Sequence, residues 1–325
     1  MSTDIRHIWC GSHSPKPSMK LRAGKLTMLY ENGNIRYISA GGNEVIRMVY
    51  SAVRDREWVN VKPVITGERI ERFSDSFRIE YYCKYISGDI NFVARYIIEG
   101  KSDNTITFSI EGEALETFEK NRIGFCVLHP VEGCAGKQCI INHSNGSNDS
   151  SVFPELISPD QVFTDIKAMT WKTGKTECHL VFSGDIFETE DQRNWTDASY
   201  KTYSTPLSLP YPATLLKGEK ISQKIEFKAE NPEQASGLND EIIELSLNTD
   251  IRIPLPKLGI GQSTRNHPLE ENEIAILKEL AFDHYRCDIY LFKEGWKEIA
   301  DQAVAETSKL GYELELVLFF DDEYL

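Results

Sequence analysis

One pattern repeats from residue 20 to about residue 228: short runs of alternating apolar and polar residues, separated by glycine and asparagine turns. Side chains alternate between the two faces of a β-strand, so a period of two predicts strands with one buried face. Asn32-Gly33, which leads into the alternating run 35–38, is a turn signal of this kind. No stretch of this region has a convincing helical period. The first two thirds of the chain are therefore restricted to an all-β fold.

Further strands are predicted at residues 77–85, 90–99, 105–113, 123–128, 177–182 and 222–227. About two hundred residues of strands at this spacing are more than a small barrel holds, whereas two packed antiparallel sheets bury one face of each. We therefore predict that residues 1–230 form a large antiparallel β-sandwich, of the supersandwich kind.

The pattern changes after Lys228. Residues 229–233 form a polar break with a proline, which predicts a linker. Strands are then expected at 257–262, 284–291 and 313–320, and amphipathic helices at 269–281 and 296–310, the second ended by Gly311. Strands that alternate with helices indicate a parallel sheet, so residues 231–325 are predicted to be the first βα units of a TIM-like (β/α)8 barrel.

Such a barrel takes about 250 residues, and three strands with two helices leave an open edge. The apolar run at 314–320 would lie on that edge. Either the chain is part of a longer protein, which is the interpretation we favour, or a partner or second copy of the chain covers the edge.

The net charge and the lack of a leader-like segment limit the partners and the location that we expect. The chain has 36 Lys and Arg against 50 Asp and Glu, a formal charge of −14, and lacks a basic run with interleaved aromatics. A surface this acidic repels phosphate backbones, so nucleic acid is not expected as a partner. The first residues lack the apolar segment of a signal peptide, and no apolar stretch approaches the ~20 residues that cross a bilayer. We predict a cytoplasmic protein without membrane contact, and with reduced cysteines.

Residues 187–203 are the densest polar segment of the chain, with four acids, an arginine, two side-chain amides, a tryptophan and two tyrosines. Carboxylates and arginine bind hydroxyls and carboxylates, and aromatic rings stack on the apolar faces of sugars. This mixture suits a small polyhydroxylated ligand. The alternative is a solvated connector in which Arg193 pairs with Glu190 or Asp197. The candidate site residues here are Glu190, Asp191, Arg193, Asn194, Trp195 and Asp197.

His129 stands at the exit of the apolar strand that begins at Arg122, directly before Pro130. A histidine at a strand end can serve as a general base near neutral pH, and Glu132 is close enough in sequence to orient it. The alternative is that His129 only bonds a backbone carbonyl in a turn.

No metal or other cofactor is predicted. Cys134 and Cys139 fit no standard zinc spacing and are expected to be packed thiols. Glycine-rich nucleotide loops and the Gly-x-Ser-x-Gly elbow of serine hydrolases are missing from the sequence. In the predicted barrel, Arg286 and Asp288 lie two positions apart on one strand and are expected to point inward as a pair that binds substrate.

The segment 187–203 resembles the signature of the D-apionate lactonase (D-apionolactonase) family. Residues 122–130 and 153–159 resemble its other marked stretches, and the similarity continues through 259–262 and 283–291. The resemblance implies an N-terminal β-sandwich, a central TIM-like barrel and a C-terminal β-domain. It also implies hydrolysis of a branched sugar-acid lactone to the open aldonate, in carbohydrate catabolism.

Lactone opening needs a base that activates water and donors that stabilise the oxyanion. The predicted base is His129 or Glu190, the predicted donors are Arg193 and Asn194, and Trp195 is the expected stacking wall. Two alternatives stay open. One is a glycoside hydrolase, whose carboxylates could lie in further barrel strands. The other is a β-domain that binds carbohydrate without catalysis.

Overall fold

The computed structural model describes residues 18–232, 253–263 and 267–321. The chain divides into two compact units, Met1–Asp240 and Glu241–Leu325. Of the linker predicted at 229–233, Ala229 and Glu230 instead end a β-strand, and Glu233 lies outside the described residues. None of the described helices is both long and apolar enough to cross a bilayer.

In its described residues, the first unit consists of β-strands with one short α-helix, α2 (Val131–Cys134), and one 3₁₀ turn, η1 (Gln192–Trp195). Its strands are β1 (Met19–Ala23), β2 (Leu26–Glu31), β3 (Asn34–Ala40), β4 (Asn43–Asp55), β5 (Pro63–Arg72), β6 (Phe77–Ser87), β7 (Ile90–Gly100), β8 (Thr105–Ala114), β9 (Phe118–Pro130), β10 (Gln138–His143), β11 (Asn148–Val152), β12 (Phe163–Thr173), β13 (Thr176–Ser183), β14 (Phe187–Asp191), β15 (Ser199–Tyr203), β16 (Ala213–Leu215) and β17 (Lys220–Glu230).

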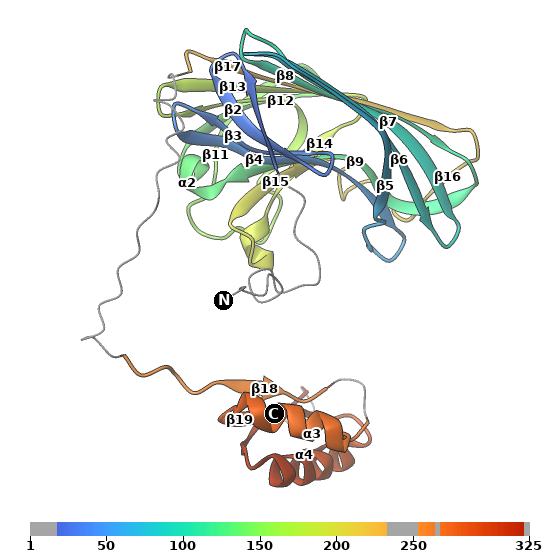
Figure 1. Cartoon of the computed structure of the whole chain (residues 1–325), viewed down its shortest axis with the longest axis vertical. Helices are drawn as coiled ribbons and strands as arrows, with labels where there is room; N and C mark the ends of the chain where they lie inside the picture. The colour runs from blue at the N-terminus through green and yellow to red at the C-terminus, as the bar shows by residue number, and fades with distance from the viewer. Residues whose placement is uncertain (1–17, 233–252, 264–266, 322–325) are drawn as a thin grey trace, which may run out of the picture. The chain divides into compact units, whose positions relative to one another are not determined.

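These strands form one antiparallel sheet that folds over on itself (Figure 1). Neighbouring strands follow the path β1-β2-β3-β4-β9-β15-β14-β12-β13-β17-β8-β7-β6-β5. The β10–β11 hairpin adds to β12, and β16 adds to the start of β9. The predicted large antiparallel β-domain is confirmed, with the difference that its layers belong to one continuous sheet.

The two ends of this sheet come close to each other. Tyr30 on β2 donates a hydrogen bond to the Glu68 carboxylate on β5, with 2.5 Å between the oxygens. Tyr81 on β6 donates to the carbonyl of Gly33, which precedes β3, at 2.7 Å. Since buried polar groups are costly unless they are paired, these bonds fix the ends of the sheet against each other. The apolar faces of the strands enclose one continuous core.

Strand β9 is unusual because both of its faces are covered. It lies between β4 and β15, and every residue from Asn121 to Pro130 is buried. One face of the strand packs in the core, and the other faces a cavity described below. This double burial explains why the sequence of β9 is nearly continuously apolar.

The second unit has the predicted alternating order. It comprises β18 (Gly259–Gly261), α3 (Glu271–Leu280), β19 (His284–Tyr290), α4 (Trp296–Leu310) and β20 (Glu313–Phe319), with β19 parallel to both other strands. Glu270 and Glu273 form a reciprocal capping box at the start of α3, and Gly311 ends α4 with a left-handed φ of 78°.

The five predicted elements of this unit are therefore confirmed, and closure into a barrel remains a prediction. β20 is the last described strand, and Leu316, Leu318 and Phe320 are about half exposed there. This agrees with an apolar run on an open sheet edge.

Candidate functional site

The polar segment 187–203 folds as β14, η1 and β15, and its arginine has a structural task. Arg193 donates to the carboxylate of Asp191 at 2.7 Å and to the carbonyl oxygens of Pro154, Glu155 and Leu156 at 2.7–3.1 Å. The Asp191 side chain has no exposed surface. The guanidinium therefore ties residues 154–156 to the hairpin and is not available as an oxyanion donor.

Asp191 is a second part of this clamp. Burial raises the pKa of the carboxyl group, but hydrogen bonds from Arg193 and the Ser158 amide outweigh burial, and the net shift of the pKa is downward. Asn194 donates to the carbonyl oxygen of Ser158 at 2.5 Å, so it also fixes the loop. Asp197 is exposed in the segment between η1 and β15. The connector hypothesis thus describes these residues, although the partner of Arg193 is Asp191 rather than Glu190 or Asp197.

His129 lies inside the core. Its side chain has no exposed surface, and Nε2 forms a 2.8 Å hydrogen bond with the hydroxyl of Thr202. The ring packs against Phe153 and Trp171, and Nδ1 has no hydrogen-bond partner among the described residues. Burial lowers the pKa of the imidazole to about 3. The structure therefore places His129 in the core without access to solvent, which corrects its expected position at an open strand end.

The remaining site candidates are exposed, each within its own unit. Glu132 is exposed on α2. Arg286 and Asp288 do form an ion pair, 2.9 Å apart, on the exposed face of β19. Cys134 and Cys139 are fully buried thiols, and no group of three metal-binding side chains occurs within the described ranges.

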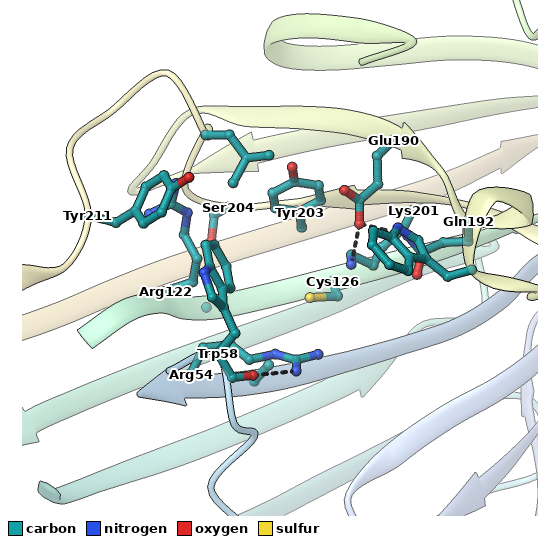
Figure 2. A pocket seen from close by; sticks show the side chains of 14 residues that line it. Arg54, Trp58, Arg122, Cys126, Glu190, Gln192, Lys201, Tyr203, Ser204 and Tyr211 are labelled. Atoms are coloured by element: carbon teal, nitrogen blue, oxygen red, sulfur yellow. Dashed lines mark hydrogen bonds and ion pairs between the residues drawn. The ribbon is translucent and has the colours of Figure 1, made fainter. Parts of the chain in front are cut away.

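A cavity of about 540 Å³ lies over β4, β9 and β15, and it contains two of the predicted residues, Glu190 and Trp195 (Figure 2). The residues that line it are Ala52, Arg54, Trp58, Arg122, Gly124, Cys126, Glu190, Gln192, Trp195, Lys201, Tyr203, Ser204, Leu207 and Tyr211.

Because side chains alternate between the two faces of a β-strand, every second residue of β9 lies on the floor of this cavity. Arg122, Gly124 and Cys126 on β9 face the cavity, whereas the odd-numbered residues between them face the core. Tyr203 on β15 lies directly opposite Cys126. His129 is one of the odd-numbered residues of β9, and for this reason its side chain points to the core.

One end of the cavity holds an ion pair. Lys201 Nζ lies 2.5 Å from Glu190 Oε1, and the Gln192 amide donates to the same oxygen at 2.6 Å. Glu190 Oε2 has no hydrogen bond among the residues that the structure describes. Lys201 also lies over the ring of Tyr203, 4.9 Å from its centroid. The pair therefore combines a carboxylate oxygen free to accept a proton with an ammonium group that has further donors.

The other end is cationic and aromatic. The Arg122 guanidinium lies over both the Trp58 and the Tyr211 ring, 5.4 and 5.0 Å from their centroids. The two rings meet edge to face at 5.1 Å. Arg54 donates to the Trp58 carbonyl at 3.0 Å and thereby holds the loop that carries this ring.

The thiol in the middle of the floor is not an activated nucleophile. Burial raises the pKa of Cys126, and the nearby Lys201 offsets this only in part. Tyr203 is also held in its protonated form, because burial and the hydroxyl's hydrogen bond to the Glu188 carboxylate, at 2.6 Å, raise its pKa. The cavity therefore offers acid–base chemistry through Glu190 and Lys201.

Sequence analysis missed Arg54, Trp58, Lys201, Tyr203 and Tyr211 as cavity residues. Lys201 and Tyr203 belong to the polar segment and are two positions apart, so they lie on the same face of one strand. This spacing is the signal in the sequence that could have identified them. Trp58 and Tyr211 come from loops about 150 positions apart, and only the pairing of β9 with β4 and β15 brings them together.

A substitution at Gly124 tests the construction of the floor. A Cβ there would collide with the Ser204 hydroxyl and the Gln223 amide, and the residue has a φ of +154°. We expect Gly124→Ala to lower the free energy of unfolding in urea by about 1–3 kcal/mol. Gly42→Ala is the control, because its φ is also positive but a Cβ would meet nothing within 4 Å. Equal losses in both variants would show that backbone strain, not the collision, is responsible.

Comparisons with known proteins cover the first unit of the chain. A family profile described as "D-apionate lactonase, N-terminal domain" matches residues 7–232. The chain belongs to the D-apionate lactonase family. A protein named D-apionate lactonase from Brucella anthropi is 38% identical over 248 residues, which are 74% of this chain and 40% of the relative. The chain thus spans less than half the length of this D-apionate lactonase.

Solved structures with a similar first unit share little sequence with this member of the D-apionate lactonase family. The Slr1438 protein from Synechocystis sp. PCC 6803 has a TM-score of 0.45 at 10% identity, covering 67% of this chain and 98% of that one. Galactose 1-epimerase from Lactobacillus acidophilus NCFM has a TM-score of 0.40 at 10% identity, covering 67% and 99%.

Proposed function

We propose that this chain hydrolyses a sugar-acid lactone, of the D-apionolactone kind, and that the cavity of the first unit is its site. Membership of the D-apionate lactonase family supports the reaction class. The Glu190–Lys201 pair inside an aromatic cavity is the observation that carries the proposal. The pathway we propose is carbohydrate catabolism in the cytoplasm.

Glu190 is the proposed base. Its Oε2 takes a proton from a water molecule, whose oxygen attacks the lactone carbonyl carbon. Lys201 Nζ holds Oε1 and donates a further hydrogen to the carbonyl oxygen as that oxygen becomes negative. The bond from the carbonyl carbon to the ring oxygen then breaks, and the proton on Glu190 passes to the ring oxygen. The product is an open aldonate with a free hydroxyl.

The aromatic walls bind the sugar. Trp195 is 74% exposed at the rim beside Glu190, and Tyr203 lies across the floor. Such rings stack on the apolar faces of sugars while their polar edges meet hydroxyls. Trp195 thus keeps the stacking role predicted for it, and Arg193, Asn194 and His129 are proposed to maintain the structure around the site.

The second unit is proposed to begin a TIM-like barrel. The parallel order β18-β19-β20 with two crossover helices supports this, as does the greater length of the Brucella relative. The exposed Arg286–Asp288 pair is proposed to bind substrate groups within such a barrel. A partner or second copy of the chain on the β20 edge is the alternative.

Glu190→Gln tests the proposal on the full 325-residue chain with D-apionolactone, by titration of the acid released. Because the amide cannot accept the water proton, we expect kcat to fall about 100- to 10,000-fold with little change in KM. Lys201→Met should lower kcat about 100- to 1,000-fold. Glu116→Gln is the matched control, since it removes a carboxylate from an exposed pair with Lys217, and should leave turnover unchanged.

Three results would contradict the proposal. They are full turnover by Glu190→Gln, hydrolysis of aryl glycosides in place of lactones, and binding of the lactone by the natural chain without turnover. The second result would favour the glycosidase alternative, and the third a binding domain.

A further inference from the structure

The cavity is larger than a single sugar lactone requires. Its volume of about 540 Å³ falls within the range of roughly 300–1,000 Å³ that holds ligands of drug size. The proposed reaction uses only the end with Glu190 and Lys201, and Figure 2 shows Trp58 and Tyr211 at a distance from that pair. One small ring at the catalytic pair therefore leaves the remainder of the cavity for another part of the substrate.

The separation of the two ends suits two linked sugar rings. Lys201 Nζ reaches to 4.9 Å from the centroid of the Tyr203 ring, and Tyr203 lies directly opposite Cys126 on β9. Arg122, which lies over the Trp58 and Tyr211 rings, is four positions earlier on that strand. At about 3.3 Å per residue, this is ~13 Å along β9. One sugar ring is shorter than this distance, whereas a disaccharide can extend over it.

The floor between the two ends has small side chains. Ala52 on β4 lies directly opposite Gly124 on β9, and both line the cavity together with Ser204. Side chains of this size leave the space above the sheet open. A ligand can therefore extend from one end of the cavity to the other without displacing a large residue.

The far end has two aromatic rings with free surface. Trp58 is 38% exposed and Tyr211 is 48% exposed, and the two rings meet at an interplanar angle of 70°. Arg122 supports both rings, while its terminal nitrogens donate to the carbonyl oxygens of Asn121 and Pro206. Exposed tryptophan and tyrosine rings of this kind stack on the apolar faces of sugars.

Local hydrogen bonds hold the Trp58 ring at the surface. Its backbone has a left-handed φ of 66°, which is uncommon for a bulky residue. The Trp58 amide donates to the Asp55 carbonyl at 3.1 Å, and the Trp58 carbonyl accepts from Arg54 at 3.0 Å. The Asp55 carboxylate accepts from the amides of Glu57 and Val59 at 2.9 and 2.8 Å. An apolar ring that is fixed outside the core is pre-organised for contact with a ligand.

We propose that Trp58 and Tyr211 form a second sugar subsite, so that the cavity takes a lactone to which a further sugar ring is linked. The lactone lies at Glu190 and Lys201, and the further ring stacks on the aromatic pair. Arg54 uses one nitrogen for the Trp58 carbonyl and has further donors for the hydroxyls of this ring. The proposal rests on the cavity being the ligand site of the proposed function, and it adds the size of the substrate.

Calorimetric titration of the 325-residue chain with D-xylose and xylobiose tests this subsite. The two sugars differ by one ring, and neither is a lactone that the chain could open. Because the second ring adds a stacked contact, we expect xylobiose to bind about tenfold more tightly or better. Trp58→Ala should reduce this advantage to about twofold or less and leave the affinity for D-xylose within about twofold. Trp58→Phe keeps a ring and should keep most of the advantage.

Tyr37→Ala is the matched control. Tyr37 is 46% exposed and also has a positive φ, of 54°, but it lies outside the lining of the cavity. Its loss should leave both affinities unchanged. Equal affinities for D-xylose and xylobiose, no binding of either sugar, or an advantage that persists in Trp58→Ala would overturn the subsite. Tighter binding of phenyl β-D-xyloside than of xylobiose would overturn the assignment to a sugar ring.

The two proposals fail separately. Tight binding of xylobiose without hydrolysis of D-apionolactone would remove the lactonase activity and keep the subsite. Hydrolysis of D-apionolactone without an advantage for xylobiose would do the reverse.

Discussion

Arg193→Ala is expected to lower the free energy of unfolding by about 3–5 kcal/mol, because it removes the partner of a buried carboxylate. Asp191 would keep its charge in a site with no exposed surface. The carbonyl oxygens of Pro154, Glu155 and Leu156 would lose their donor at the same time. Urea unfolding followed by fluorescence measures the loss, and turnover on the lactone measures whether the folded fraction stays active.

A control separates this effect from the loss of any arginine. Arg56→Ala removes a side chain that is 64% exposed and whose ion pairs are 3.5 Å or longer. We expect its stability to change by no more than about 0.5 kcal/mol. If Arg193→Ala kept its stability but lost turnover, Arg193 would have the oxyanion role that sequence analysis gave it.

Acid should weaken the first unit through His129. The pKa of this imidazole is lowered by burial from its ordinary 6.5 to about 3. Between these two values the unfolded chain binds a proton that the folded chain does not. The contribution of His129 to the free energy of unfolding is therefore fully present above pH 6.5. It is lost as the pH falls, by up to about 1.4 kcal/mol per pH unit.

His129→Phe tests this sign by urea unfolding at pH 7.5 and pH 5. The phenyl ring keeps the packing against Phe153 and Trp171 but cannot take up a proton. We expect the decrease in stability between the two pH values to be about 2 kcal/mol smaller than in the natural chain. His143→Asn is the control, because a hydrogen bond to Asp149 raises the pKa of His143 and its contribution has the opposite sign. The same pH dependence in His129→Phe and the natural chain would contradict the buried, neutral imidazole.

The sequence predicts the fold well where each strand has one buried face. The alternating runs 77–85 and 90–99 became β6 and β7, and the helix at 296–310 has the bounds of α4. β9 is different because the core covers one face and the cavity covers the other. In an apolar run of this kind, the residue types do not show which positions share a face of the strand. The sequence therefore could not show that Cys126 faces the cavity and His129 the core.

The site was predicted in part for a related reason. A dense polar segment indicates a site or a clamp equally well, and here it is both. Glu190 and Trp195 line the cavity, whereas Arg193 and Asn194 hold the loop. The division depends on which face of β14 and which side of η1 a residue takes, and on carbonyl groups some 40 positions away. Trp58 and Tyr211 depend on strand pairing across still longer separations.

The order of strands in the sheet also has a consequence for how the protein is made. Glu113 on β8 pairs with Lys220 on β17, roughly a hundred positions later. A ribosome that adds about 5–20 residues per second would need ~5–20 s to cover that distance. Until then the backbone groups on one edge of β8 have no strand partner in the nascent chain, and contacts this distant in sequence form slowly. Cotranslational folding of this unit can therefore be completed only after β17 has emerged, and the interval before that is when chaperones would be needed.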